Sequence, residues 1–142
     1  MSRWVVDASV AVKWFLPEVH SESVDRLLRG NYQLLAPDLI WAEFGNVLWK
    51  QWRRKEIEAE VAQGILRDFL RFPLDVHGSE PLLQLAWAIA AEFERTVYDS
   101  LYLALAQSTG CPLVTADWKL YKALKPTRFS PQLLWVEDIP GR

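Results

Sequence analysis

Short runs of β-branched, leucine and aromatic residues alternate along the chain with longer segments in which apolar residues recur every three or four positions. A short apolar run is typical of a buried strand, and the longer spacing is typical of one face of a helix. The runs that predict strands are residues 3–7, 32–37, 72–76, 111–117 and 133–138. The segments that predict helices are residues 8–15, 20–29, 38–55, 58–71, 79–93, 96–110 and 118–125.

Capping residues mark several helix ends. Asp38 and Ser79 stand where the N-caps of two helices are expected, and Gly110 is expected to close a third helix. The helices at 38–55 and 58–71 follow each other closely and are expected to form a hairpin. Strands that alternate with helices predict an α/β domain with a mostly parallel central sheet and helices on both faces. No linker or repeat divides the chain, so residues 1–142 are expected to form a single domain.

Composition narrows the class of protein. The chain has 51% apolar and 24% charged residues, as soluble globular proteins do, and no run approaches the roughly 18 to 20 apolar residues that cross a bilayer. The first residues do not resemble a secretory signal, and the single cysteine, Cys111, excludes an internal disulfide and suits the cytoplasm. The net charge of −2 argues against tight duplex binding but is compatible with an acidic cluster that holds metal ions.

Four acids stand where the pattern calls for other residues. Asp7 and Asp117 each follow an apolar strand run, and the carboxyl ends of parallel strands form the crevice where ligands bind. Glu43 and Asp99 each lie among apolar residues of a helix. A buried carboxylate is costly unless it is paired, hydrogen-bonded or bound to metal. The four acids are therefore expected to meet around a divalent hard cation such as Mg²⁺ or Mn²⁺.

Each acid also has a simpler interpretation. Asp7 and Asp117 suit helix N-caps, Glu43 could reach solvent from its helix, and Asp99 suits the positive end of a helix dipole. No one of these roles explains why four such acids occur together, so the metal site remains the preferred interpretation.

Four segments that contain these acids resemble the motif blocks of PIN-domain ribonucleases in order and spacing. They are VVDASVAVKWF, AEFGNVLWK, TVYDSLYLALA and LVTADWKLYKAL, and nearly the full chain resembles a VapC-type toxin of a type II toxin-antitoxin pair. The resemblance implies a PIN-like three-layer α/β/α fold. The chain departs from the family pattern at two positions. Gly45 stands where the family often has a less flexible residue, and Trp118 stands where a polar or basic residue is common.

The resemblance also implies a set of site residues. The acidic, metal-binding cluster would be Asp7, Glu43, Asp99 and Asp117, with Asp7 and Asp99 as the expected direct ligands of Mg²⁺ or Mn²⁺. Three further residues would support the site: the hydroxyls of Ser9 and Thr115 and the amide of Asn46. Trp118 departs from the family pattern, but its place beside Asp117 makes its ring a candidate for stacking on an RNA base.

The implied function is metal-dependent endonucleolytic cleavage of single-stranded or looped RNA. The implied partners are an RNA substrate, a cognate antitoxin protein and a second copy of the chain in a homodimer, with no role for a membrane. The alternative is a PIN-like RNA-binding or protein-interaction module that is weak or inactive as a catalyst.

Three other classes of α/β protein lack the residues that they would need. A haloacid-dehalogenase-type phosphatase would need an acid where Ser9 stands, a receiver domain would need an acidic pair near the start, and a dinucleotide binder would need a glycine-rich turn.

Residues outside these blocks have ordinary interpretations. His20 and His77 lack the spacing of a metal site and are expected at the surface, whereas Cys111 is expected to fill apolar space. Trp49 and Trp52 lie beside a run of basic residues. Packing in the core or against another subunit is favoured for them over contact with RNA.

Overall fold

A five-stranded sheet forms the centre of the computed structural model, which describes residues 2–16 and 32–140. The strand order is β3-β2-β1-β4-β5, and every neighbouring pair is parallel. The predicted parallel α/β class is therefore confirmed. The strands are β1 (Ser2–Val6), β2 (Tyr32–Pro37), β3 (Asp75–His77), β4 (Leu113–Thr115) and β5 (Leu133–Trp135).

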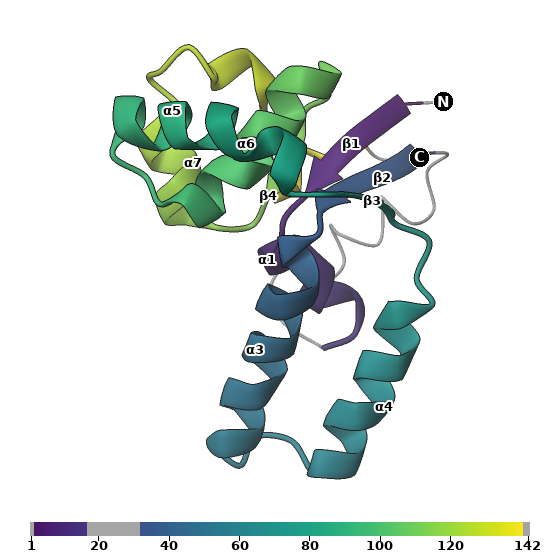
Figure 1. Ribbon diagram of the computed structural model, residues 1–142. Coiled ribbons are helices and arrows are strands. Elements are labelled where there is room, and N and C mark those ends of the chain that lie inside the picture. The colour runs from purple at the N-terminus through teal and green to yellow at the C-terminus, as the bar shows by residue number, and fades with distance from the viewer. Residues whose placement is uncertain (1, 17–31, 141–142) are drawn as a thin grey trace.

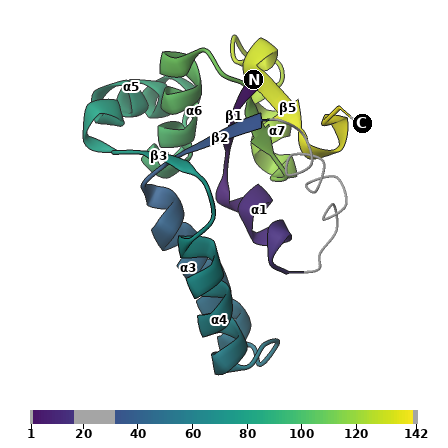
Figure 2. The same ribbon diagram turned by 90° about the vertical axis from the view of Figure 1, so that its right-hand side faces the viewer.

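Helices lie on both sides of this sheet, and two of them form a hairpin that projects away from it (Figures 1 and 2). The hairpin is α3 and α4, as predicted. The helix predicted at residues 20–29 falls outside the described residues. The described helices are α1 (Ala8–Ala11), α3 (Leu39–Arg53), α4 (Ala59–Leu70), α5 (Leu83–Phe93), α6 (Val97–Thr109) and α7 (Trp118–Leu124). Short 3₁₀ turns lie at Val12–Trp14, Glu80–Leu82, Ser130–Gln132 and Val136–Asp138.

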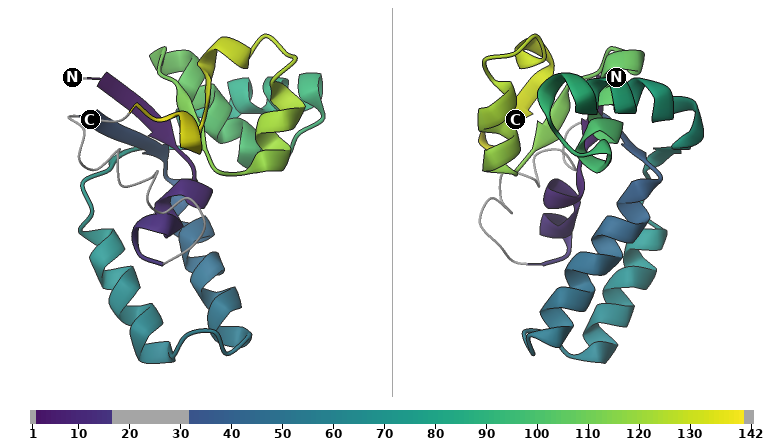
Figure 3. Two further views of the ribbon diagram at one scale, coloured as in Figure 1. Left: turned by 180° about the vertical axis from the view of Figure 1, so that it is seen from behind. Right: turned by 60° about the vertical axis from the view of Figure 1, so that its left-hand side comes forward.

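Alternate residues of the central strands face opposite sides, as the two-residue period of a strand requires. Val5 of β1 packs into a core built with α5, α6 and α7, whereas Val6 packs into a core that includes Val10 and the C-terminal Val136 and Ile139. A third core fills the base of the hairpin, where α1 meets α3 and α4. Viewed from behind, α5 to α7 and the C-terminal segment lie to one side of β1 and β2, whose N-terminal ends extend clear of them (Figure 3). The burial of Val5 and Val6 on two faces explains why the strands read as continuous apolar runs.

Two predicted N-caps form a different contact. Asp38 has φ −63° and ψ −17°, within the helical region, and its side chain does not cap α3. Its carboxylate instead accepts hydrogen bonds from the Ser79 hydroxyl and from the Ser79 backbone N–H, and Ser79 caps no helix either. Asp38 and Ser79 thus stand at the predicted N-cap positions, but neither side chain makes a capping hydrogen bond, because the two side chains bond to each other. Gly110 does end α6, with φ +69°, as predicted.

The third strand lies further along the chain than predicted. Residues 72–76 were expected to be extended, but β3 spans Asp75–His77. Phe72 donates its backbone N–H to the Phe69 carbonyl at 3.0 Å and so belongs to the turn that follows α4. Pro73 has no N–H to give to a sheet. The strand can therefore begin only after the proline.

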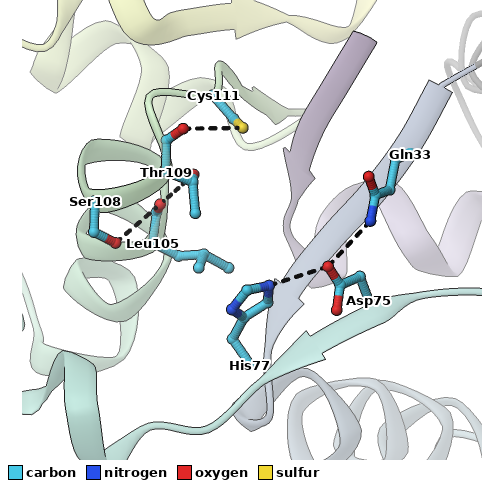
Figure 4. A network of polar contacts seen from close by, with 7 residues as sticks. All are labelled: Gln33, Asp75, His77, Leu105, Ser108, Thr109 and Cys111. Carbon is cyan, nitrogen blue, oxygen red and sulfur yellow. Dashed lines mark hydrogen bonds and ion pairs between the residues drawn. The ribbon is translucent and has the colours of Figure 1, made fainter. Parts of the chain in front are cut away.

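Several residues outside the acidic set behave as ordinary side chains. His77 hydrogen-bonds to Asp75, which also accepts from Gln33, at the β2–β3 edge of the sheet (Figure 4). Cys111 is buried, as predicted. Trp49 and Trp52 are 48% and 47% exposed, so the prediction that they pack in the core of the chain is wrong.

None of the described helices is long and apolar enough to cross a membrane.

Candidate active site at the carboxyl edge of the sheet

The four acids singled out in the sequence line one pocket. Asp7 follows β1 and Asp117 lies two residues beyond β4, and these strands are neighbours in which Val6 pairs with Val114. Glu43 comes from the first half of α3, and Asp99 comes from the first turn of α6. The remaining lining residues are Ala8, Ser9, Tyr102 and Leu120. Parallel strand order thus brings together acids that lie far apart in the chain.

Asp7 is the most buried of the four acids and is held by three donors. Its side chain accepts hydrogen bonds from the Ser9 hydroxyl at 2.5 Å, the Thr115 hydroxyl at 2.5 Å and the Val10 backbone N–H at 3.1 Å. The last of these contacts caps α1, so the simpler interpretation of Asp7 is also correct. The helix cap uses only the Val10 N–H. The Ser9 and Thr115 hydroxyls are therefore not needed for capping, and they stabilise the carboxylate of Asp7.

The two hydroxyls are oriented by backbone groups beyond β4. The Ser9 Oγ accepts from the Ala116 N–H at 3.1 Å, and the Thr115 Oγ1 accepts from the Asp117 N–H at 3.0 Å. A hydroxyl that accepts in this way keeps its one hydrogen for another partner. Each points that hydrogen at Asp7, which favours the ionised carboxylate.

Burial and these hydrogen bonds have opposite effects on the acids. Burial raises the pKa of Asp7 to about 6, although the Ser9, Thr115 and Val10 donors lower it, and the charge of Asp117 raises it further. Burial also raises the pKa of Glu43, against the lowering effect of its hydrogen bond with Tyr102. The charge of Asp99 adds to the rise. Both acids thus hold protons more tightly than exposed carboxyls do.

The other three acids each have a separate partner. Tyr102 donates its hydroxyl to Glu43 Oε1 at 2.6 Å, and Arg95 pairs with Asp99 Oδ2 at 3.0 Å. Asp117 Oδ1 accepts the Leu120 N–H at 3.2 Å and so caps α7.

Tyr102 and Arg95 were not predicted from the sequence. Both lie at helical spacing from Asp99, three residues after it and four residues before it, and this spacing could have indicated them.

Three predicted site residues, Asn46, Thr115 and Trp118, do not line the pocket. Asn46 is exposed on α3, one turn beyond Glu43. Trp118 is 55% exposed and stacks against Tyr121, with centroids 5.8 Å apart, and its ring edge meets Trp135. Ser9 lines the pocket, and Thr115 lies buried behind Asp7 and donates its hydroxyl to that carboxylate.

The donor set fits a hard divalent cation. All four acids offer oxygen ligands, and Glu43 Oε2, Asp99 Oδ1 and Asp117 Oδ2 accept no hydrogen bond from residues 2–16 and 32–140. A cation would also offset the desolvation that raises the pKa of Asp7. Within the same residues, no three His, Cys, Asp or Glu side chains are already gathered closely enough to hold a metal ion. Each acid is instead held by its own hydrogen-bond partner.

Replacing Thr115 by valine tests the support of Asp7. The substitution keeps the branched shape but removes the donor to Asp7 and the acceptor for the Asp117 N–H. We expect the pKa of Asp7 to rise above about 6, and the free energy of unfolding at pH 7 to fall by about 1–3 kcal/mol. Urea unfolding and the pH midpoint of Mn²⁺ binding measure the two effects. The control is Thr109→Val, which removes a hydroxyl that bonds to Leu105. An unchanged pH midpoint in Thr115→Val would contradict the role of Thr115.

Comparisons with known proteins agree with this geometry. Residues 4–125 match the PIN domain family. Ribonuclease VapC3 of Pyrobaculum aerophilum is 36% identical over 120 residues, which are 83% of this chain and 92% of that relative. The crystal structure of PAE2754 from Pyrobaculum aerophilum is similar with a TM-score of 0.72 at 27% identity, covering 96% of this chain and 85% of that one. A toxin-antitoxin complex from Klebsiella pneumoniae shares the fold alone, with a TM-score of 0.66 at 15% identity over 95% and 98% of the two chains.

Proposed function

The chain belongs to the PIN domain family, and from this premise we propose that it is a VapC-type ribonuclease toxin that depends on Mg²⁺ or Mn²⁺ and cleaves single-stranded or looped RNA internally. The observation that carries the proposal is the meeting of four carboxylates in one pocket, with hydroxyl donors aimed at the most buried of them. The ribonuclease name of the 36% identical relative supports the same activity.

Asp7 and Asp99 are the proposed direct ligands of the metal, with Glu43 and Asp117 as further ligands or as acceptors for water beside it. When bound, a divalent ion activates water, polarises the scissile phosphate and stabilises the leaving oxygen. The hydrogen bonds from Ser9 and Thr115 favour the ionised form of Asp7 against the effect of burial, and Arg95 fixes the orientation of Asp99.

Glu43 is the proposed acceptor of the proton from the attacking water. Burial raises its pKa towards the range in which a carboxylate is an effective general base, and Tyr102 leaves Oε2 available for this transfer. Burial also raises the pKa of Tyr102, so its hydroxyl stays protonated and keeps donating to Glu43.

An inactive PIN-like binding module is the alternative. A module that only binds RNA or protein has no need for a buried carboxylate, because an ionised group at that depth lowers stability unless something compensates. Asp7 is 7% exposed and is served by two hydroxyls that are themselves oriented by the backbone. The presence of this costly arrangement favours an active enzyme over an inactive binding module.

An antitoxin and a second copy of the chain are the proposed protein partners. The similar fold from Klebsiella pneumoniae is that of a toxin-antitoxin complex, which supports the first. Leu83 and Trp87 lie one turn apart on α5 and are 51% and 65% exposed, so they offer apolar surface for the second. We propose the cytoplasm as the place of action, because cellular RNA is the proposed substrate.

Sequencing of RNA ends after brief induction in a host that lacks the antitoxin tests the proposed function directly. Wild-type protein should create new RNA ends at defined positions and arrest growth, whereas Asp7→Asn at equal abundance should do neither. Normal growth and an unchanged RNA-end profile with folded wild-type protein would contradict the toxin activity. Co-expression of the protein encoded beside it should restore growth if that protein is the antitoxin.

A further inference from the structure

A cluster of cations lies at the far end of α3, away from the acidic pocket. Lys50, Arg53 and Arg54 line a surface hollow together with Trp49, and all four side chains are exposed. The Arg53 guanidinium lies over the Trp49 ring, 5.4 Å from its centroid. The three cations form no ion pair with any residue in the described part of the chain, whereas Arg95 and Arg128 are paired with carboxylates. Their charge is therefore available to a ligand.

The same helix connects this cluster to the acidic pocket. Lys50 and Arg54 follow Glu43 by seven and eleven residues, close to two and three whole turns, so Lys50 shares the Glu43 face of α3 and Arg54, the C-cap residue, continues it. The rise of a helix places Lys50 about 10 Å and Arg54 about 16 Å beyond Glu43. Exposed Asn46 lies one turn from Glu43 and one turn from Lys50, between the two groups. These residues thus form a polar and cationic stripe that starts at the pocket. The helix that carries it leads from the sheet out along the projecting hairpin (Figure 1).

We propose that this stripe of α3, comprising Asn46, Trp49, Lys50, Arg53 and Arg54, binds the single-stranded RNA that extends from the acidic pocket. A role in substrate binding presupposes the ribonuclease function proposed above. Lys50 and Arg54 would neutralise phosphates along the strand, as cations do in other single-strand grooves. The Trp49 ring, already faced by Arg53, offers a surface on which a base stacks. Asn46 would donate to the backbone nearest the pocket.

Electrostatics favours a polyanion on this face. The chain has a net charge of −2, and its proposed active site contains four carboxylates that repel phosphate until a metal is bound. The three unpaired cations lie within a few nucleotides' length of the pocket, so their attraction for phosphate offsets that repulsion. The apolar hollow between α3 and α4, lined by Leu48, Trp52 and Leu66 among others, has the chemistry that a protein partner would cover instead. Trp49 borders both hollows, whereas the three cations line only the second. RNA is therefore the occupant that the cationic face fits.

Binding of a fluorescein-labelled single-stranded RNA of mixed sequence tests the stripe. The test variant is Lys50→Gln/Arg54→Gln, and the matched control is Arg67→Gln/Arg71→Gln, which removes the same charge from exposed positions on and just after α4. Both are made in an Asp7→Asn chain so that the RNA stays intact. At low salt we expect the test variant to bind about tenfold more weakly, and its slope of log K against log salt to be shallower by about 1.4, the value for two lost single-strand phosphate contacts. Trp49→Leu should weaken binding several-fold with an unchanged slope.

Two comparisons decide the outcome. An equal loss of RNA affinity in both double variants, or a loss in neither, would overturn the RNA-binding role of the stripe. Circular dichroism melts verify that each variant is folded. A Lys50→Gln/Arg54→Gln chain that binds RNA normally but loses its antitoxin would also overturn it and assign the face to protein. Cleavage is measured separately with Asp7 intact, where KM for a long oligomer should rise more in the test variant than in the control. Wild-type protein that binds RNA through the stripe but never cleaves it would refute the ribonuclease function alone.

Discussion

The Asp7→Asn protein should cleave RNA roughly 100-fold more slowly than wild type, or worse, because a metal site supplies several kcal/mol of transition-state stabilisation and each 1.36 kcal/mol is a factor of ten. Asparagine keeps the shape of the side chain and one acceptor for the Ser9, Thr115 and Val10 donors, so the fold should persist. Single-turnover cleavage of a labelled RNA measures the loss. Asp68→Asn, at an exposed position of α4, is the matched control and should behave as wild type.

The same substitution should stabilise the protein at neutral pH when metal is removed. Burial raises the pKa of Asp7 from 3.8 to about 6, so the folded chain binds this proton more tightly than the unfolded chain does. Asp7 therefore adds stability below about pH 4 that is lost as the pH rises to about 6. Above pH 6 the ionised group disfavours folding by up to about 3 kcal/mol. Asp7→Asn removes this penalty, so its Tm in EDTA at pH 8 should exceed that of wild type. A lower Tm would show that Asp7 stabilises the fold as a cap.

Removal of divalent metal with EDTA should abolish RNA cleavage, and added Mg²⁺ or Mn²⁺ should restore it. The four carboxylates of the pocket otherwise repel both one another and the phosphate of the substrate. Mn²⁺ should also raise the Tm of wild-type protein at pH 8, since a ligand that binds only the folded state stabilises it. Below about pH 6 this gain should shrink, because protons compete for Asp7.

The Asp7→Asn protein is the control for this experiment, and Mn²⁺ should raise its Tm far less. Cleavage that survives complete chelation would refute the metal mechanism, whatever its rate. A shift in Tm of equal size in both proteins would instead place the bound Mn²⁺ outside the acidic pocket.

The parts of the fold that follow from periodicity were predictable. The buried strands at the centre of the sheet, the α3–α4 hairpin and the α6 helix with its closing Gly110 each carry a strong local pattern, and each is found. The meeting of Asp7 with Asp117 was predictable too, because it needs only that the strands before them are parallel neighbours. These predictions hold because the local pattern and the tertiary arrangement agree.

The remaining features depend on contacts that no local pattern records. Asp38 and Ser79 have the residue types of N-caps, but each found the other as a partner 41 positions away. The spacing of Tyr102 from Asp99 could have indicated its place on the helix, but not its bond to Glu43, which lies on another helix 59 positions away. Trp49 and Trp52 are large and apolar, yet they stay exposed because the hairpin that carries them projects beyond the sheet. In each case the packing of whole helices and strands determines which residues the side chain contacts.

The hydrogen bond between Thr115 and Asp7 joins residues 108 positions apart, and the one between Ser9 and the Ala116 N–H spans 107. A ribosome therefore produces Asp7 and Glu43 long before the hydroxyl of Thr115 and the carboxylate of Asp117 exist. Until β4 has emerged and taken its place beside β1, the most buried acid lacks a donor and the pocket lacks a wall. A chain that has not yet reached β4 therefore cannot assemble the complete site.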